Sequence, residues 1–266
     1  MNKLITSLQN PLIRNILLLQ EKPRERKNQG LFLVEGRREI SLAITSGFTI
    51  RTLLHCPGMI TPPELESLGI TGATEEVIEC SGEVYNRIAY RKDTGGVIAV
   101  AVQRRMSFED LRLSETPLLL VLESVEKPGN LGAILRTADA AALDAVIICD
   151  PQTDIYNPNT VRSSIGCIFS VPVVTSTSAE TMAWLKARKI GSCATALSAR
   201  HLYSETDFRK PSAIIMGTEA TGLSEAWLGG ADTLIKIPMK GRIDSMNVSV
   251  SAAIVVFEAL RQRNFR

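Results

Sequence analysis

Apolar runs and helical patterns divide the chain into two parts near residue 104. In the first part, apolar residues at helical spacing predict helices, and short apolar or alternating runs predict strands. The expected helices cover residues 11–20, 35–45 and 81–90, and the expected strands cover residues 31–34, 49–56 and 97–102. This pattern predicts a small α/β domain formed by residues 1–104.

Residues 103–117 form a polar linker that ends in a proline, and the rest of the second part, residues 105–266, has a more regular order. Continuous apolar runs predict strands covered on both faces, and each is followed by a turn and a helical pattern. The expected strands are 118–122, 145–149, 190–196, 213–216 and 234–237, and the expected helices are 129–142, 158–166, 179–188 and 248–263. Strands that alternate with helices predict an α/β domain with a mostly parallel sheet.

Composition restricts the function classes. Hydrophobic residues make up 45% and charged residues 22% of the chain, which is typical of globular proteins. The apolar runs are too short to cross a bilayer, and no apolar signal segment follows the first methionine, so we expect a cytoplasmic protein without a membrane partner. Neither the five cysteines nor the two histidines have metal-ligand spacing, so we expect no metal. A cofactor that carries the reactive group fits this composition better.

The net charge of +2 does not by itself indicate nucleic acid. Residues 1–38, however, hold eight lysines and arginines but only three glutamates. A local basic surface of this kind binds phosphates even on a nearly neutral chain. A solvated charged face explains the same charges equally well, so charge alone leaves both interpretations open.

Three segments carry candidate chemistry, and each joins a predicted strand to a loop or helix. Residues 123–138 form a glycine-containing turn before a helix, where free backbone N–H groups suit anions. Its Arg136 lies two turns into an otherwise apolar helix and needs a polar partner. An ordinary strand–helix turn is the alternative interpretation for this segment.

The other two segments end at the same predicted edge of the sheet. Residues 214–224 place Glu219 in a loop bracketed by glycines, and residues 237–251 place Asn247 and Ser249 at the start of the last helix. Ligands bind along this edge in open α/β sheets. Helix capping alone would explain one of the two polar residues at the helix start. Neither glycine-rich turn has a nucleoside-triphosphate or dinucleotide signature.

In combination and order, these segments resemble the three motifs of the SpoU/TrmH RNA 2′-O-methyltransferases, members of the SPOUT superfamily, over about residues 117–264. Residues 159–166 also resemble the Arg-Ser-containing helix of that family. Thr218, Ala220 and Met246 depart from the usual motifs but remove no polar group that the chemistry needs. Residues 1–103 resemble, more loosely, the ribosomal-protein-like substrate-binding domain of several rRNA methyltransferases.

The resemblance implies a C-terminal trefoil knot, a homodimer that meets at the knot and the last helix, and S-adenosylmethionine as the cofactor. It implies that the catalytic residues are Asn130, Arg136, Glu219, Asn247 and Ser249. We expect Asn130, Glu219 and Asn247 to form a hydrogen-bonded set that holds Arg136 and the loops. The resemblance also implies that the cofactor is bound by Thr195, Ala196, Leu197, Gly217, Thr218, Glu219, Gly222, Ile237, Pro238, Met239, Met246, Asn247, Val248 and Ser251.

The sequence therefore predicts methyl transfer to a ribose 2′-hydroxyl of structured RNA, with 23S rRNA favoured over tRNA because of the extra N-terminal domain. A catalytically silent RNA-binding protein of the same fold is the nearest alternative, and the complete set of polar motif residues argues against it. A metabolic α/β enzyme with a nucleotide cofactor would have no use for the basic N-terminal part. A simple binding module leaves the glycine-rich loops unexplained.

Overall fold

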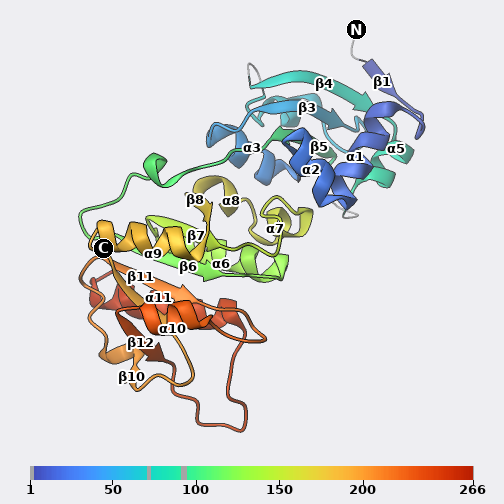
Figure 1. Cartoon of the computed structure of the whole chain (residues 1–266). Helices are drawn as coiled ribbons and strands as arrows, with labels where there is room; N and C mark the ends of the chain where they lie inside the picture. Colours follow the sequence, from blue (N-terminus) through green and yellow to red (C-terminus); the bar gives the residue numbers. More distant parts are fainter. Residues whose placement is uncertain (1–2, 71–72, 91–94, 266) are drawn as a thin grey trace. The chain divides into compact units, whose positions relative to one another are not determined.

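Packing contacts divide the chain into two units that are not continuous in sequence. The computed structural model describes residues 3–70, 73–90 and 95–265. One unit contains Met1–Arg104 together with Asp154–Ser170, and the other contains Arg105–Thr153 together with Val171–Arg266 (Figure 1). A segment from the later part of the sequence therefore packs with the N-terminal part.

The first unit is built on a five-stranded mixed sheet with the order β1-β4-β3-β5-β2. The strand β5 pairs antiparallel with β2 and β3, and the remaining pairs are parallel. The bounds are β1 (Lys3–Ile5), β2 (Leu31–Glu35), β3 (Ile50–His55), β4 (Thr74–Cys80) and β5 (Val97–Val102).

One face of this sheet is covered by α1 (Pro11–Glu21) and α5 (Gly82–Ile88). Asn10 starts α1, because its side chain accepts a hydrogen bond from the N–H of Leu12 at 2.9 Å and a proline follows it. Apolar side chains of α1 at helical spacing then join the buried core. The shorter helices of the unit are α2 (Pro23–Gln29), α3 (Arg37–Thr45) and α4 (Pro62–Glu66).

The segment of residues 154–170 supplies two more helices to this unit, α7 (Pro158–Ser163) and α8 (Cys167–Ser170). Aromatic rings hold it in place: Phe32 of β2 lies 4.3 Å from Tyr156, and Phe48 lies 5.1 Å from Phe169, between ring centroids. The fully buried guanidinium of Arg26 also donates to Asp154 at 2.5 Å. An apolar contact face and a partly buried ion pair therefore bind the segment to the N-terminal fold.

The second unit contains a seven-stranded sheet with the order β10-β12-β9-β11-β6-β7-β8, in which every strand pair is parallel. Its central strands are buried along their whole length, as expected for a sheet covered on both faces. The bounds are β6 (Leu118–Glu123), β7 (Ala145–Cys149), β8 (Val173–Ser176), β9 (Gly191–Thr195), β10 (His201–Leu202), β11 (Ser212–Met216) and β12 (Thr233–Lys236).

Helices cover both faces of this sheet. On one face, α9 (Ser178–Ala187) and α10 (Glu225–Gly230) share an apolar core with alternate residues of β6, β7 and β11. The helices α6 (Pro128–Ala140) and α11 (Val248–Gln262) contribute nothing to that core but contact each other, β7 and β11, so they cover the opposite face. Two short 3-10 turns, Phe108–Asp110 and Tyr203–Glu205, lie in the connections.

The prediction of an α/β fold with a mostly parallel sheet, preceded in the sequence by a smaller unit, is confirmed. The trefoil knot stays a prediction. Sequence patterns missed the strands β1, β4, β8 and β10 and the short helices α2, α4, α8 and α10. Glutamates interrupt the apolar pattern of β4, and α2 has a charged sequence. The patterns also placed Glu35 in a helix although it ends β2. Within the described residues, no helix is long and apolar enough to cross a membrane.

Candidate functional site

The three motif segments meet at the edge of the second sheet where its strands end. The turn after β6 leads into α6, the loop after β11 leads to α10, and the segment after β12 leads into α11. Because the strands are parallel, their carboxyl ends lie at one edge, and the N-termini of α6 and α11 reach the same place. The topology therefore brings together residues that are more than a hundred positions apart.

Asn247 and Asn130 form a direct link between two of the motifs. The side-chain nitrogen of Asn247 donates to Oδ1 of Asn130 at 3.1 Å. Oδ1 of Asn247 accepts from the backbone N–H of Ser249 at 2.9 Å and from its hydroxyl at 2.6 Å. Asn247 therefore caps α11 and also connects its first turn to α6. The structure brings three predicted catalytic residues into one hydrogen-bonded chain.

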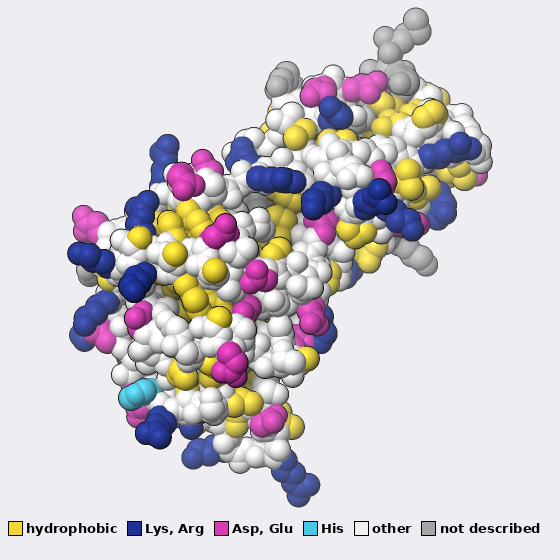
Figure 2. Space-filling view, viewed as in Figure 1, with side chains coloured by type: hydrophobic (Ala, Val, Ile, Leu, Met, Phe, Trp, Pro, Cys, Tyr) yellow, Lys and Arg dark blue, Asp and Glu magenta, His cyan; other side chains and the backbone are white. Residues whose placement is uncertain are grey.

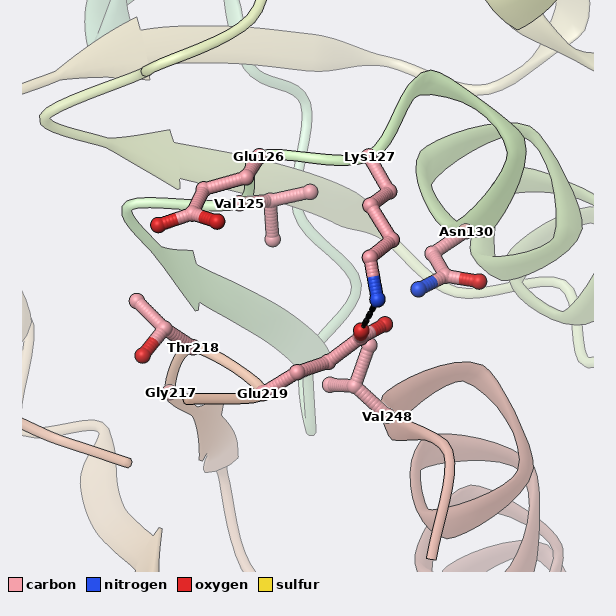
Figure 3. A pocket seen from close by; sticks show the side chains of 8 residues that line it. All are labelled: Val125, Glu126, Lys127, Asn130, Gly217, Thr218, Glu219 and Val248. Carbon is pink, nitrogen blue, oxygen red and sulfur yellow. Dashed lines mark hydrogen bonds and ion pairs between the residues drawn. The ribbon is translucent and has the colours of Figure 1, made fainter. Parts of the chain in front are cut away.

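Glu219 forms an ion pair with Lys127, which joins the first and second motifs (Figure 3). Lys127 is 66% exposed and Glu219 is 26% exposed, so the pair lies at the surface of a shallow pocket. Figure 3 shows the ammonium group and Asn130 on the same side of this pocket. Lys127 was not among the predicted site residues. Its position three residues before Asn130 was the available signal, but sequence does not show which carboxylate a lysine meets.

Arg136 lies apart from this chain of contacts. It is on the exposed side of α6 and has no hydrogen-bond or ion-pair partner within the described residues. A guanidinium in this position keeps all five N–H donors available for another molecule. The structure therefore links Asn130, Asn247 and Ser249 by hydrogen bonds and places Glu219, paired with Lys127, in the pocket that Asn130 also lines, but it does not join Arg136 to them.

A cavity of about 530 Å³ opens beside these residues. The loops after β9, β11 and β12 and the start of α11 form its wall. Its volume falls within the range of about 300–1,000 Å³ that is typical of small-molecule and cofactor sites. All residues predicted to bind the cofactor line this cavity except Pro238 and Asn247: they are Thr195, Ala196, Leu197, Gly217, Thr218, Glu219, Gly222, Ile237, Met239, Met246, Val248 and Ser251.

Gly217 is required by the close approach of two backbone segments in this wall. A Cβ atom at this position would lie 2.3 Å from the carbonyl carbon of Gly222 and 2.5 Å from the nitrogen of Leu223. The backbones of Thr218 and Gly222 exchange two hydrogen bonds, of 2.9 and 3.2 Å, which close the loop. Gly222 itself has φ +72°, a conformation that glycine adopts readily.

The buried thiols of the sheet are unsuited to nucleophilic chemistry. Burial raises the pKa of Cys149 and of Cys193 to about 11, so both stay protonated near neutral pH. All five cysteines are free. Among the described residues, no group of three or more histidine, cysteine, aspartate and glutamate side chains has an arrangement that could hold a metal ion.

Comparisons with known families match both parts of the chain. Residues 117–257, more than half of the chain, match the SpoU rRNA Methylase family. Residues 10–99 match the MRM3-like substrate binding domain. The predicted family and the predicted type of N-terminal domain are confirmed.

Relatives match nearly the whole chain. The 23S rRNA (uridine(2479)-2′-O)-methyltransferase of Streptomyces viridochromogenes is 31% identical, over 90% of this chain and 85% of its own length. The 23S rRNA (guanosine(2553)-2′-O)-methyltransferase RlmP of Bacillus subtilis is 31% identical, over 96% and 98%. The AdoMet-bound rRNA methyltransferase structure from Sinorhizobium meliloti has a TM-score of 0.90 at 31% identity and covers 97% of each chain. This chain therefore belongs to the SpoU rRNA methylase family.

Proposed function

We propose that this protein transfers a methyl group from S-adenosylmethionine to a ribose 2′-hydroxyl of 23S rRNA. The observation that carries the proposal is the cavity of about 530 Å³, which Glu219 lines and which lies next to the hydrogen-bonded pair Asn130 and Asn247. A cofactor in the cavity would lie beside the polar groups that receive the substrate. Relatives named as 23S rRNA 2′-O-methyltransferases support the choice of reaction.

The residues of the cavity fit S-adenosylmethionine. Glycine at position 217 brings backbone N–H and C=O groups close to the cavity, and apolar side chains such as Leu197 and Met246 line it. When bound, the cofactor supplies an electrophilic methyl group on a sulfonium. The protein contributes binding, placement and the charge around the acceptor oxygen. Because the reacting atoms must approach a line, placement accounts for much of the rate.

The polar residues then orient the ribose. Asn130 and Asn247 fix each other through their amides, and Lys127 holds the carboxylate of Glu219 at the pocket surface. Arg136 cannot act as a base, because a guanidinium stays protonated in proteins. We assign it to the substrate, where it orients the 2′-hydroxyl or its phosphate and stabilises the developing alkoxide, while phosphate or water accepts the proton. An Arg136→Lys enzyme with wild-type turnover would refute a need for the planar guanidinium.

We assign RNA binding to the first unit, residues 1–104 with the packed segment 154–170, and catalysis to the rest of residues 105–266. Figure 2 shows lysine and arginine side chains gathered over the region of α1 and α2. Lys22, Arg24 and Lys27 are the exposed cations of this turn. In the same unit, the Arg162 guanidinium lies 5.7 Å from the ring centroid of Tyr90, which is 51% exposed. Exposed arginine–tyrosine pairs suit stacking with unpaired bases.

We also propose a homodimer formed through α11. Val250 and Phe257 are 50% and 43% exposed, and their spacing of seven residues places them on the same side of the helix. Apolar side chains left exposed on one helix face are typical of an interaction surface. Because ribosomal RNA is the substrate, we expect the enzyme in the cytoplasm, and it needs no metal for this chemistry.

Methyl transfer tests the proposal. The purified protein is incubated with methyl-labelled S-adenosylmethionine and either unmodified 23S rRNA or unmodified tRNA. Label in 23S rRNA alone supports the proposal, and label in tRNA alone would show that tRNA is the substrate instead of rRNA. A protein that binds the cofactor and both RNAs but transfers no label would be a catalytically silent binder.

A further inference from the structure

Glu123 is a buried carboxylate next to the site; it opens the first motif segment but is not among the predicted site residues. It ends β6 and is 6% exposed. One of its oxygens accepts the backbone N–H of Ser224 at 2.8 Å, and the other accepts the hydroxyl of Ser224 at 2.6 Å. Burial of a charged carboxylate is costly unless hydrogen bonds compensate it, so this pair of bonds is a specific structural feature.

Ser224 is the last residue of the loop of residues 217–224, which carries Glu219 and forms part of the cavity wall. Its first residue, Gly217, directly follows β11 and is held by the sheet. Ser224 comes directly before α10, but its side chain makes no hydrogen bond to that helix. The hydroxyl is used by Glu123 instead. Glu123 therefore anchors the far end of the loop to the neighbouring strand.

The anchor is braced by further hydrogen bonds. The hydroxyl of Ser178 lies 3.3 Å from Glu123 and donates to Asp150 at 2.7 Å. The hydroxyl oxygen of Ser178 also accepts a hydrogen bond from the indole N–H of Trp227, a fully buried residue of α10, at 3.0 Å. The ends of β6 and β7, the start of α9 and the helix after the loop thus form one network. A network with this many partners limits the movement of the loop end.

We propose that Glu123 is a positioning residue for methyl transfer: it holds the loop of residues 217–224 in the conformation that cofactor binding and Glu219 require. The inference rests on the proposed function, because it assigns the loop a role in that reaction. Glu123 itself contacts neither the cavity nor the pocket of Lys127 within the described residues. Its influence passes through Ser224.

Glu123→Gln tests the inference with little change of shape. The amide keeps one acceptor but presents a donor to the second Ser224 group, so one charge-assisted hydrogen bond is lost. We expect faster hydrogen exchange at the amides of residues 218–223, a Kd for S-adenosylmethionine raised about tenfold, and lower kcat. Ser224→Ala, which removes only the hydroxyl, should show a smaller change of the same kind. It is the test variant if Glu123→Gln does not fold.

The chain offers a control with the same chemistry at the opposite edge of the sheet. Asp232, just before β12, accepts hydrogen bonds from the backbone N–H of Ser192 at 2.8 Å and from its hydroxyl at 2.7 Å. Ser192 lies near the start of β9. Both bonds end on one oxygen of Asp232, so Asp232→Asn removes the carboxylate charge from a comparable contact away from the site. It should lower the melting temperature without changing loop exchange or the Kd of the cofactor.

Three results would decide the matter. Faster loop exchange and weaker cofactor binding in Glu123→Gln, but not in Asp232→Asn, support a positioning role. Wild-type exchange and Kd in Glu123→Gln overturn it, as does an equal loss of affinity in the control. Failure of the proposed function is distinguishable, because the wild-type protein would then transfer no methyl group to RNA, whereas hydrogen exchange still measures whether Glu123 holds the loop.

Discussion

The side-chain amide of Asn247 donates to the side-chain oxygen of Asn130 across 3.1 Å and so connects the first turns of α11 and α6. The same Asn247 caps α11 through Ser249. One residue therefore combines a stabilising role with a role in the site, and the two can be separated because they use different atoms. The oxygen makes the cap, and the nitrogen makes the link.

We predict that Asn247→Asp preserves stability but lowers turnover. Aspartate caps helices as well as asparagine does, so the free energy of unfolding should change by less than about 1 kcal/mol. The new carboxylate oxygen faces Oδ1 of Asn130 and cannot donate to it. Asn10→Asp at the cap of α1 is the control, because Asn10 uses only its oxygen. Equal turnover of Asn247→Asp and wild type would show that the amide link is dispensable.

We predict that Gly217→Ala abolishes cofactor binding. The added Cβ would meet backbone atoms of Gly222 and Leu223 at 2.3–2.5 Å, and backbone cannot rotate away as a side chain can. Crowding of this kind costs on the order of 1–3 kcal/mol and would reshape the cavity wall. Gly229→Ala in α10 is the control, since a Cβ there meets no atom within 4 Å. Titration calorimetry with S-adenosylmethionine measures the effect, and unchanged affinity of Gly217→Ala would contradict it.

Sequence patterns were most informative where local chemistry and topology agree. The apolar runs of β6, β7 and β11 predict a parallel sheet, and the order of the strands then determines that the motif loops share an edge. The proximity of Asn130 and Asn247 was expected on this basis. A hydrogen bond between them was also expected, but which amide atoms form it was not, because strand order does not determine that.

We predict that neutralising the basic turn of α1 and α2 weakens RNA binding. The combined change Lys22→Gln, Arg24→Gln and Lys27→Gln should lower the affinity for 23S rRNA and reduce the slope of log affinity against log salt by roughly 1 to 3, at about 0.7–0.9 per lost phosphate contact. The control neutralises three exposed cations near the end of α9: Lys186, Arg188 and Lys189. Filter binding at several salt concentrations provides both slopes. Equal effects of the two triple variants would contradict an RNA surface on the first unit.

We predict that His55 makes stability depend on pH. Burial lowers the pKa of His55 below its usual 6.5, against a smaller opposing effect of Glu79, and its buried Nε2 has no hydrogen-bond partner in the described structure. The unfolded chain therefore binds the proton more tightly than the fold does. The stability is fully present above pH 6.5 and falls as pH decreases below it, by up to about 1.4 kcal/mol per pH unit until the folded-state pKa is reached.

Thermal unfolding followed by circular dichroism at pH values on both sides of 6.5 checks this prediction. His55→Leu introduces an apolar side chain at this buried position and removes the titrating group. Its melting temperature should fall less than that of the wild type as the solution is acidified. Parallel curves for the two proteins would show that other groups cause the acid sensitivity.

The features that sequence could not supply are contacts between distant residues. Glu123 and Ser224 each look like an ordinary end of a strand or start of a helix, and only the fold shows that they bind each other. The segment with α7 lies between strands of the second unit but packs on Phe32 and Arg26 of the first. Its helical pattern was visible, whereas its packing partner was not, because periodicity indicates an apolar face and not what covers it.

The central claim is methyl transfer to a ribose oxygen, and the nucleosides of the methylated RNA test it most directly. Wild-type protein is incubated with S-adenosylmethionine and unmodified 23S rRNA, and the RNA is digested to nucleosides and analysed by mass spectrometry. We predict one additional 2′-O-methylnucleoside, which Asn247→Asp forms more slowly. Methyl groups found on the bases, or no methylation by a protein that binds the cofactor and the RNA, would contradict the account.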